Sequence, residues 1–314
     1  MQKQPEIKNK SYNKECFIMD NIKFKGIYSA TFSLYDENMN VLKGSVRKLI
    51  EYNLKGGVNG FYVGGNTGEC TVLPNKTRKQ MLETVKEVAG NAQIIAHVGA
   101  GHLDDVDDLI EHANAVGVDA IASLPPSLTS YYSPEETVEY YKHLAKKSKS
   151  NVLAYITPVL KCDIMWFAKQ IMAIDNVIGI KLTVPDYYLF EKIKLVNDGN
   201  INILNGPDEA MLAGLSMGAD GAIGSTYNIV PTLARGIYDN FQNGDIKKAL
   251  EYQHKLNRFI DVMLGGNTAR WKTPLTLLGI DIGYTVAPAK MPSEDDIKEV
   301  IKKLEAAGTT EYIK

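Results

Sequence analysis

The chain has 314 residues, of which 45% are hydrophobic, and a formal net charge of −2 at pH 7. This length allows one α/β barrel with additions or two ordinary domains. The nearly balanced charge provides neither a basic surface for nucleic acid nor a polybasic patch for membranes, so we expect partners of neither kind. Because no run of about 18 apolar residues occurs, we expect no transmembrane helix.

The N-terminal segment and the cysteines indicate in which cellular compartment the protein is expected. Residues 1–23 are polar and charged and lack the apolar segment of a signal peptide, so we interpret them as an N-terminal tail. The three cysteines, Cys16, Cys70 and Cys162, are odd in number and widely spaced. This pattern suits a reduced protein better than a disulfide framework, and we expect a cytoplasmic location.

Short apolar segments alternate with segments of helical spacing along the rest of the chain. Strands are expected at residues 25–32, 60–65, 93–99, 119–124, 153–158, 178–183, 202–206 and 220–224. Helices are expected at 44–55, 76–88, 104–115, 163–174, 245–262, 269–278 and 293–306. One more is expected after Ser133, where serine, proline and glutamate form a helix start signal.

Eight strand-then-helix units predict an α/β fold. The expected architecture is a closed (β/α)₈ TIM barrel rather than an open sheet. No linker or shift in composition divides the chain, so we interpret residues 24–314 as a single domain. The helices from about residue 244 onward would form a C-terminal extension. We expect it to pack outside the barrel and to contribute to a subunit interface.

Two polar residues end neighbouring expected strands, Tyr155 the fifth and Lys181 the sixth. In such barrels, side chains that do chemistry lie at the C-terminal strand ends. Burying an unpaired ammonium is costly, so the site must pair Lys181 or accept its proton, and a neutral lysine is a nucleophile for carbonyls. A neighbouring tyrosine can shuttle protons. The alternative is a purely structural tyrosine–lysine contact.

The second expected strand leads into a glycine-rich loop, Gly64-Gly65-Asn66-Thr67-Gly68-Glu69. Backbone N–H groups of such a loop, opening into a helix, can bind an anion. Asn66 and Thr67 add side-chain donors, enough for one carboxylate. The alternative is an ordinary glycine-rich turn.

Two acidic residues, Asp208 and Glu209, follow the seventh expected strand, and Ser225 follows the eighth. Adjacent carboxylates would repel a phosphate but suit a row of sugar hydroxyls. Alternatively, they cap a helix N-terminus. The five histidines show no metal-ligand spacing, so we expect no metal site.

Together, and in the order in which they occur along the chain, these motifs resemble those of the class I, lysine-dependent aldolase family of N-acetylneuraminate lyase and dihydrodipicolinate synthase. The resemblance runs from Lys25 to about Leu264 and is carried by residues 64–69, 155–158, 179–183 and 218–225. It implies a Schiff base between Lys181 and the C2 carbonyl of pyruvate or another 2-oxo acid, with Tyr155 as the proton shuttle. Asn66, Thr67 and their N–H groups would hold the carboxylate, and no metal or organic cofactor would be required.

Within the family, the sequence is similar to the sialic acid lyase branch. Residues 205–209 resemble that branch's acidic sugar-binding motif, residues 224–228 match its strand-eight segment, and a threonine follows the lysine at the expected distance. The resemblance therefore assigns substrate binding to Thr183, Gly206, Asp208, Glu209 and Ser225.

Three further positions separate the branches of the family or depart from them. Leu160 occupies the place of an arginine that binds a second carboxylate in the synthases, which argues against a dihydrodipicolinate synthase. Asn66 stands where the lyases usually carry serine. The loop after the fourth strand is longer than usual, so Tyr131 or Tyr132 could replace a tyrosine that family members place near the catalytic one.

The implied reaction is reversible cleavage of N-acetylneuraminate to pyruvate and N-acetylmannosamine by a homo-oligomer, a tetramer or a dimer. The alternatives are a 2-keto-3-deoxy sugar acid aldolase, a dihydrodipicolinate-type synthase, and a barrel that binds 2-oxo acids without catalysis. The pairing of Tyr155 with Lys181 argues against the last of these.

Overall fold

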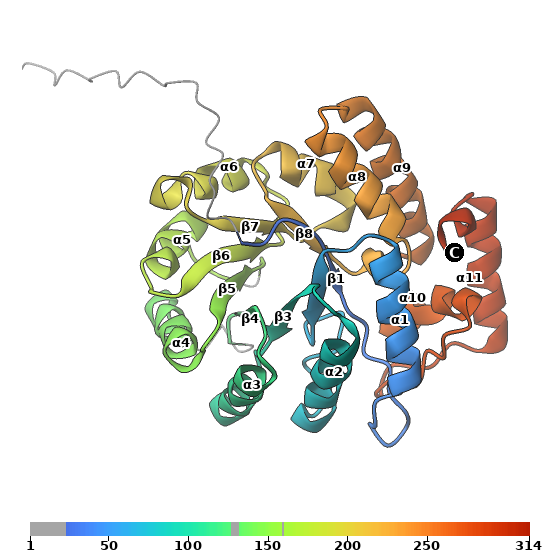
Figure 1. The fold of residues 1–314 in the computed structure, drawn as a ribbon, viewed down its shortest axis with the longest axis horizontal. Helices are drawn as coiled ribbons and strands as arrows, with labels where there is room; N and C mark the ends of the chain where they lie inside the picture. Colours follow the sequence, from blue (N-terminus) through green and yellow to red (C-terminus); the bar gives the residue numbers. More distant parts are fainter. Residues whose placement is uncertain (1–22, 127–131, 159) are drawn as a thin grey trace, which may run out of the picture.

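The computed structural model describes residues 23–126, 132–158 and 160–314. Within these residues, eight parallel strands pair in chain order and close on themselves, because β8 pairs with β1 (Figure 1). The strands are β1 Gly26–Ala30, β2 Gly60–Val63, β3 Gln93–His97, β4 Ala120–Ser123, β5 Asn151–Ile156, β6 Val177–Leu182, β7 Asn202–Asn205 and β8 Gly221–Gly224. The predicted (β/α)₈ barrel is confirmed.

A helix follows each strand and packs on the outside of the barrel (Figure 1). These helices are α1 Lys43–Lys55, α2 Asn75–Val88, α3 Leu103–Val116, α4 Pro134–Lys147, α5 Ile164–Met172, α6 Tyr188–Lys194, α7 Met211–Ser216 and α8 Pro231–Gln242. The C-terminal extension adds α9 Ile246–Met263, α10 Thr268–Lys272 and α11 Glu294–Ala306. Figure 1 shows α9 beside α8, and α11 contacts α9.

Helix boundaries follow the local signals in the sequence. At α4, the Ser133 hydroxyl accepts from the Glu136 N–H at 3.1 Å, and the Glu136 carboxylate accepts from the Ser133 N–H at 2.7 Å. This reciprocal cap satisfies two N–H groups that have no partner within the helix. At α5, Asp163 accepts from the Trp166 N–H, so the helix begins one residue after the expected start.

The alternation of side chains along the strands divides the apolar residues into two cores. Residues such as Ile27, Phe61 and Ile94 pack between the strands and the helices. Their neighbours in sequence, including Tyr28, Tyr62 and Ile95, fill the barrel interior together with Phe24, Ala30, Ala120, Ala122, Leu153, Leu204 and Ile223. Lys181 lies opposite Tyr155 on one side and Leu204 on the other, so it shares the inward face of the barrel.

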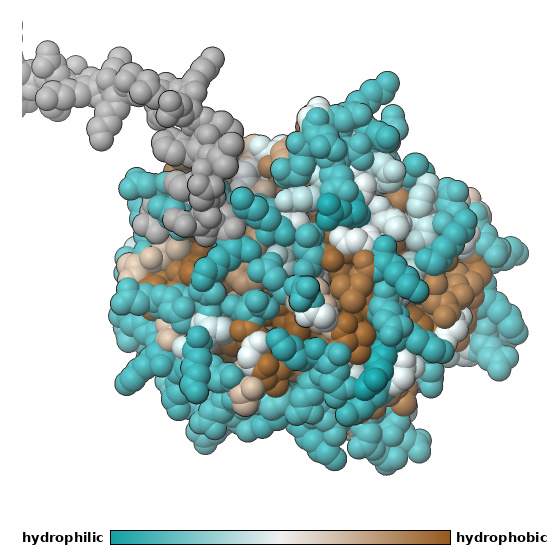
Figure 2. All heavy atoms as spheres, viewed as in Figure 1, coloured by the Kyte–Doolittle hydropathy of each residue, from teal (hydrophilic) through white to brown (hydrophobic). Residues whose placement is uncertain are grey.

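No helix among the described residues combines the length and the apolar character needed to cross a membrane. Figure 2 shows hydrophilic side chains over most of one face, with hydrophobic surface in patches between them.

One buried asparagine links the segments that follow the first and the last strand of the barrel, β1 and β8. The Asn228 amide donates to the carbonyls of Ala30 at 2.6 Å and Ser225 at 2.8 Å, and it accepts from the Phe32 N–H at 3.2 Å. Asn228 closes a short 3₁₀ turn, η4 (Thr226–Asn228), directly after β8. Its side chain thus links the segment after the last strand to the segment after the first.

Replacing Asn228 by alanine should lower the free energy of unfolding by about 3 kcal/mol, because buried N–H and C=O groups would lose their partners. Urea unfolding would measure this change. The exposed Asn91 offers a matched control, and Asn91→Ala should change stability by less than about 0.5 kcal/mol. Equal stabilities of the two variants would show that the closure of the barrel between β1 and β8 does not depend on Asn228.

Candidate functional site

Tyr155 and Lys181 lie side by side on β5 and β6, directly opposite each other in the strand register. The Lys181 Nζ lies 4.2 Å from the centre of the Tyr155 ring. Both side chains are buried, with 6% and 7% of their surface exposed. No ion pair of Lys181 is found within the described ranges, so aromatic rings, rather than a carboxylate, surround the amine.

Tyr62, on β2, is the second ring against the lysine and was not predicted as a site residue. The Lys181 Nζ lies 4.6 Å from the centre of its ring, which meets the Tyr155 ring edge-on at 6.3 Å. Burial, and then the nearby Tyr155, raise the pKa of the Tyr62 phenol well above its ordinary value. Its hydroxyl has no hydrogen-bond partner among the described residues. A Cβ on Gly65 would lie 2.3 Å from this ring, so residue 65 must be glycine.

The glycine-rich loop after β2 forms a compact turn. The Glu69 N–H donates to the Asn66 carbonyl at 2.9 Å, and the Cys70 N–H donates to the Gly65 carbonyl at 3.2 Å. In the described structure, the backbone hydrogen bonds of the turn do not use the N–H groups of Asn66 and Thr67. Both groups therefore remain available to an anion.

The helix expected at residues 76–88 is present as α2, which begins at Asn75, so several turns separate it from Asn66. The helix therefore adds no N-terminal dipole at Asn66, and anion binding would depend on the turn itself. Asn66 is exposed and its Oδ1 accepts from the Cys70 thiol at 3.4 Å, whereas Thr67 is half-buried.

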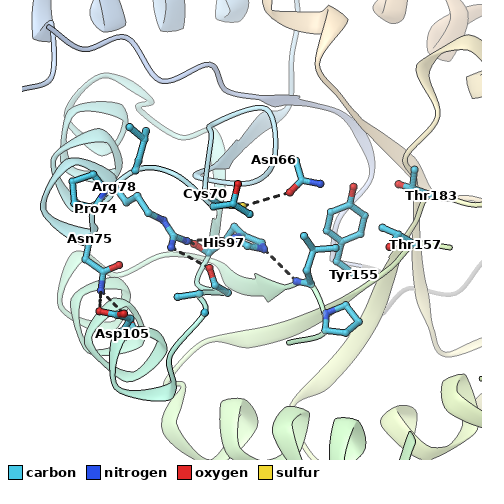
Figure 3. Close-up of a pocket in the computed structure, with 17 residues that line it drawn as sticks. Asn66, Cys70, Pro74, Asn75, Arg78, His97, Asp105, Tyr155, Thr157 and Thr183 are labelled. Carbon is cyan, nitrogen blue, oxygen red and sulfur yellow. Dashed lines mark hydrogen bonds between the residues drawn. The ribbon is translucent and has the colours of Figure 1, made fainter. Parts of the chain in front are cut away.

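A cavity of about 710 Å³ opens beside this loop and Tyr155 (Figure 3). Figure 3 shows the Tyr155 phenol oxygen directed towards the space between Asn66 and Thr183. The far wall of the cavity comes from the end of β3 and from α2 and α3, and includes Asn75, Arg78, His97 and Asp105. Three of the predicted residues, Asn66, Tyr155 and Thr183, therefore line one space.

Arg78 and His97 were not predicted as site residues, and their contacts are those of a structural pair. The guanidinium of Arg78 donates to the carbonyls of Gly99 at 3.0 Å and His97 at 2.8 Å. Burial lowers the pKa of His97 well below its ordinary value, and the adjacent Arg78 adds to this effect. A neutral imidazole accepts the Leu124 N–H at 3.2 Å. No group of three or more potential metal ligands occurs among the residues described.

A second cavity of about 490 Å³ adjoins the first at Thr183. The other predicted residues at its wall are Gly206, Asp208, Glu209 and Ser225, so all five assigned positions meet there. A Cβ on Gly206 would lie 1.8 Å from the Thr183 Oγ1, which requires glycine at residue 206. The Thr183 Oγ1 is buried and has no partner in the described structure.

Asp208 is buried, whereas Glu209 is exposed. The Asp208 Oδ2 accepts from the Thr226 N–H at 2.9 Å and the Thr226 hydroxyl at 2.8 Å, while its Oδ1 has no partner among the described residues. Burial raises the pKa of Asp208 to about 6, against the effect of the Thr226 hydrogen bonds. The helix-capping alternative is correct only in part. Asp208 caps η4 across the barrel end, not its own turn, η3 (Asp208–Ala210).

The C-terminal extension, which was expected to pack outside the barrel, also reaches this cavity. Asn257, Ile260, Asp261, Leu264 and Trp271 line the second cavity.

Two amides on one stripe of α9 hold the backbone of the acidic turn. The Gln253 Nε2 donates to the Asp208 carbonyl at 3.0 Å, and the Asn257 Nδ2 donates to the Glu209 carbonyl at 3.0 Å. Their spacing of four residues was visible in the sequence, but their partners were not.

The remaining sequence expectations concern the loops. Leu160 is buried in the core between strands and helices, so no charged group stands at that position. Tyr132 is 48% exposed and lines neither cavity. Tyr131 and residues 1–22 lie outside the described residues.

Replacing Asp208 by asparagine should remove a pH-dependent loss of stability. Because its folded pKa of about 6 exceeds the ordinary 3.8, the folded chain binds more protons between these values, and its free energy of unfolding falls as the pH rises. A pKa difference of this size corresponds to roughly 3 kcal/mol. In urea unfolding at pH 4 and pH 7, the parent should therefore lose roughly 2–3 kcal/mol more than Asp208→Asn. Equal losses would contradict the assignment.

The proteins that this chain resembles include N-acetylneuraminate lyases and sialic acid aldolases. N-acetylneuraminate lyase of Clostridium perfringens is 34% identical over 290 residues, which are 89% of this chain and 99% of that protein. The Ruminococcus gnavus sialic acid aldolase catalytic lysine mutant has a TM-score of 0.84 at 29% identity, with 90% and 96% of the two chains covered. A Clostridium difficile protein solved in complex with mannosamine has a TM-score of 0.84 at 30% identity, with 91% and 99% covered.

The family assignment agrees with these similarities and with the closed barrel. Residues 23–307 match the dihydrodipicolinate synthetase family. That match spans the barrel and most of the C-terminal extension. The chain therefore belongs to the dihydrodipicolinate synthetase family.

Proposed function

We propose that this chain is a Schiff-base aldolase that reversibly cleaves N-acetylneuraminate to pyruvate and N-acetylmannosamine. The observation that carries the proposal is the buried Lys181 amine, which lies against Tyr155 with no carboxylate partner in the described structure. An amine held in this way is free to attack a carbonyl rather than being committed to an ion pair. The relative from Ruminococcus gnavus is named for a catalytic lysine, which supports the same role for Lys181.

The Lys181 amine attacks the C2 carbonyl of the open-chain sugar acid, and loss of water gives an iminium. Tyr155 takes the proton from the C4 hydroxyl, the C3–C4 bond breaks, and its electron pair passes into the iminium. The products are N-acetylmannosamine and an enamine of pyruvate. Protonation of the enamine at C3 and hydrolysis release pyruvate and the free lysine. The iminium is itself the electron sink, so the proposal includes no metal or organic cofactor.

The two cavities divide the substrate between them in this proposal. The carboxylate binds Asn66, Thr67 and their free N–H groups, close to the Tyr155 phenol. The hydroxyls of the sugar chain bind in the second cavity, which Thr183 shares with the first.

In the second cavity, the sugar chain is bound by Thr183, Gly206, Asp208, Glu209 and Ser225. The unpartnered oxygens of Thr183 and Asp208 are acceptors that substrate hydroxyls would satisfy.

The apolar, buried Leu160 favours the lyase over a dihydrodipicolinate-type synthase, because a second carboxylate would find no bidentate partner there. A 2-keto-3-deoxy sugar acid would use the same chemistry and remains the alternative substrate. The proposal also includes a cytoplasmic location and a homo-oligomer, a tetramer or a dimer.

Pyruvate release from N-acetylneuraminate, coupled to NADH oxidation by lactate dehydrogenase, tests the function. The parent should turn over, and Lys181→Ala should lose at least about 10³-fold in rate because the covalent route is gone. Lys169→Ala, at an exposed lysine on α5, is the matched control and should keep parent activity.

Two outcomes would overturn parts of this proposal. Release only from 2-keto-3-deoxygluconate would change the substrate and leave the chemistry intact. No release from either compound, with pyruvate still bound, would favour a binding protein.

Replacing Tyr155 by phenylalanine should separate imine formation from bond cleavage. Trapping of pyruvate on Lys181 by borohydride should continue, while kcat falls by roughly 10²–10⁴-fold, because only the proton transfer is lost. Tyr188→Phe, at a tyrosine that is 57% exposed, should behave as the parent. Unchanged turnover of Tyr155→Phe would exclude Tyr155 as the proton shuttle.

A further inference from the structure

A buried ion pair joins the glycine-rich loop to the C-terminal extension. The Lys272 Nζ, at the end of α10, lies 2.5 Å from the Glu69 Oε1, and the Tyr35 hydroxyl donates to the Glu69 Oε2 at 2.5 Å. All three side chains are less than 8% exposed. Neither Lys272 nor Tyr35 was singled out in the sequence. Lys272 lies 203 positions from Glu69 along the chain.

The buried charge of Glu69 is neutralised only while its ion pair with Lys272 is intact. Burial lowers the pKa of the Lys272 amine below its ordinary value, while the adjacent Glu69 acts in the opposite direction. Burial and the hydrogen bond to Glu69 raise the pKa of the Tyr35 phenol. Without Lys272, the Glu69 carboxylate would be a buried charge with no cation, which is far more costly than either an intact pair or no charge.

The backbone of Glu69 also stabilises the turn of the glycine-rich loop. It has a positive φ of 61°, which is uncommon for a residue other than glycine and needs support from its surroundings. Its N–H closes the turn onto the Asn66 carbonyl, and its own carbonyl accepts from the N–H groups of Val72 and Leu73. The Ser33 hydroxyl fixes the preceding carbonyl, that of Gly68, at 2.9 Å. Glu69 therefore joins the buried ion pair to the turn that presents the Asn66 and Thr67 N–H groups.

We propose that Lys272 is a positioning residue for substrate carboxylate recognition, acting through Glu69. The inference rests on the proposed function, in which the Asn66–Thr67 turn binds the carboxylate of a 2-oxo acid. Lys272 touches neither the Tyr155–Lys181 pair nor, in this proposal, the substrate. Its loss should weaken recognition of the carboxylate and leave the amine chemistry of Lys181 intact.

The test compares pyruvate with methyl pyruvate, which keeps the carbonyl but has no carboxylate charge. The half-saturating concentration of each is measured by borohydride trapping on the parent, Lys272→Met and Lys272→Arg. Lys272→Met should raise the value for pyruvate about tenfold while changing the value for methyl pyruvate little, the scale of one charged hydrogen bond. Lys272→Arg keeps the charge and should restore pyruvate to within about threefold of the parent.

Lys194→Met is the matched control, because Lys194 also forms a partly buried ion pair, 2.7 Å from Asp220. Asp220 lies just before β8, at the opposite end of the strands from the loop. This variant should keep the parent ratio of the two half-saturating concentrations. If Lys272→Met does not fold, Glu69→Gln combined with Lys272→Met removes both charges and should show the same loss of selectivity.

Each outcome decides one question. A lower melting temperature for Lys272→Met with an unchanged ratio between the two ligands would show a purely structural role and overturn the inference alone. An equal rise for both ligands would place the effect at Lys181 instead of the carboxylate loop and would also overturn it. Absence of trapping by the parent would refute the proposed function, on which the inference depends.

Discussion

A lysine side chain enclosed by the barrel is the constraint around which the site is arranged. Closure of eight strands directs every second side chain into a narrow interior, and at Lys181 that interior provides the rings of Tyr62 and Tyr155. Rings attract a cation more weakly than a buried carboxylate does and leave its nitrogen accessible. The described structure thus keeps the amine ordered without committing its lone pair or proton to a permanent partner.

The charges near the lysine are distributed to suit this arrangement. Lys181 influences the buried Asp208, whose pKa it lowers against the larger effect of burial. On the other side, His97 is neutral, because burial, Arg78 and Lys181 all oppose its protonation. One cavity therefore presents acceptors for hydroxyl groups, and the other presents free N–H groups beside the Tyr155 phenol.

The sequence predicted the barrel well, since short apolar strands and amphipathic helices are local patterns. It also predicted the adjacency of Tyr155 and Lys181, because consecutive strands pair in such a barrel. Tyr62 was missed, since β2 reaches the lysine only across the closed interior and nothing local marks its ring as different from any core tyrosine. The nine residues between Gly65 and Asn75 form turns that the glycine pattern does not specify in detail, although the start of the following helix was predicted to within one residue.

The role of the extension could not be predicted, because contacts such as that between Lys272 and Glu69 join distant parts of the chain. The physical reason for these contacts lies in the two loops that bound the site. After β2 the chain passes through several turns before its helix, and after β7 it enters a single 3₁₀ turn. Backbone and carboxylate groups in such segments lack partners from regular structure and must find them elsewhere.

Both loops obtain some of these partners from the C-terminal extension. Helix α9 supplies the amides of Gln253 and Asn257 to the carbonyls of the acidic turn, and α10 supplies Lys272 to the carboxylate of Glu69. Since α9 and α10 are connected by only a few residues, the two loops are held by one continuous segment. The barrel strands fix the positions of Tyr155 and Lys181, whereas the extension holds the loops on two sides of the cavities.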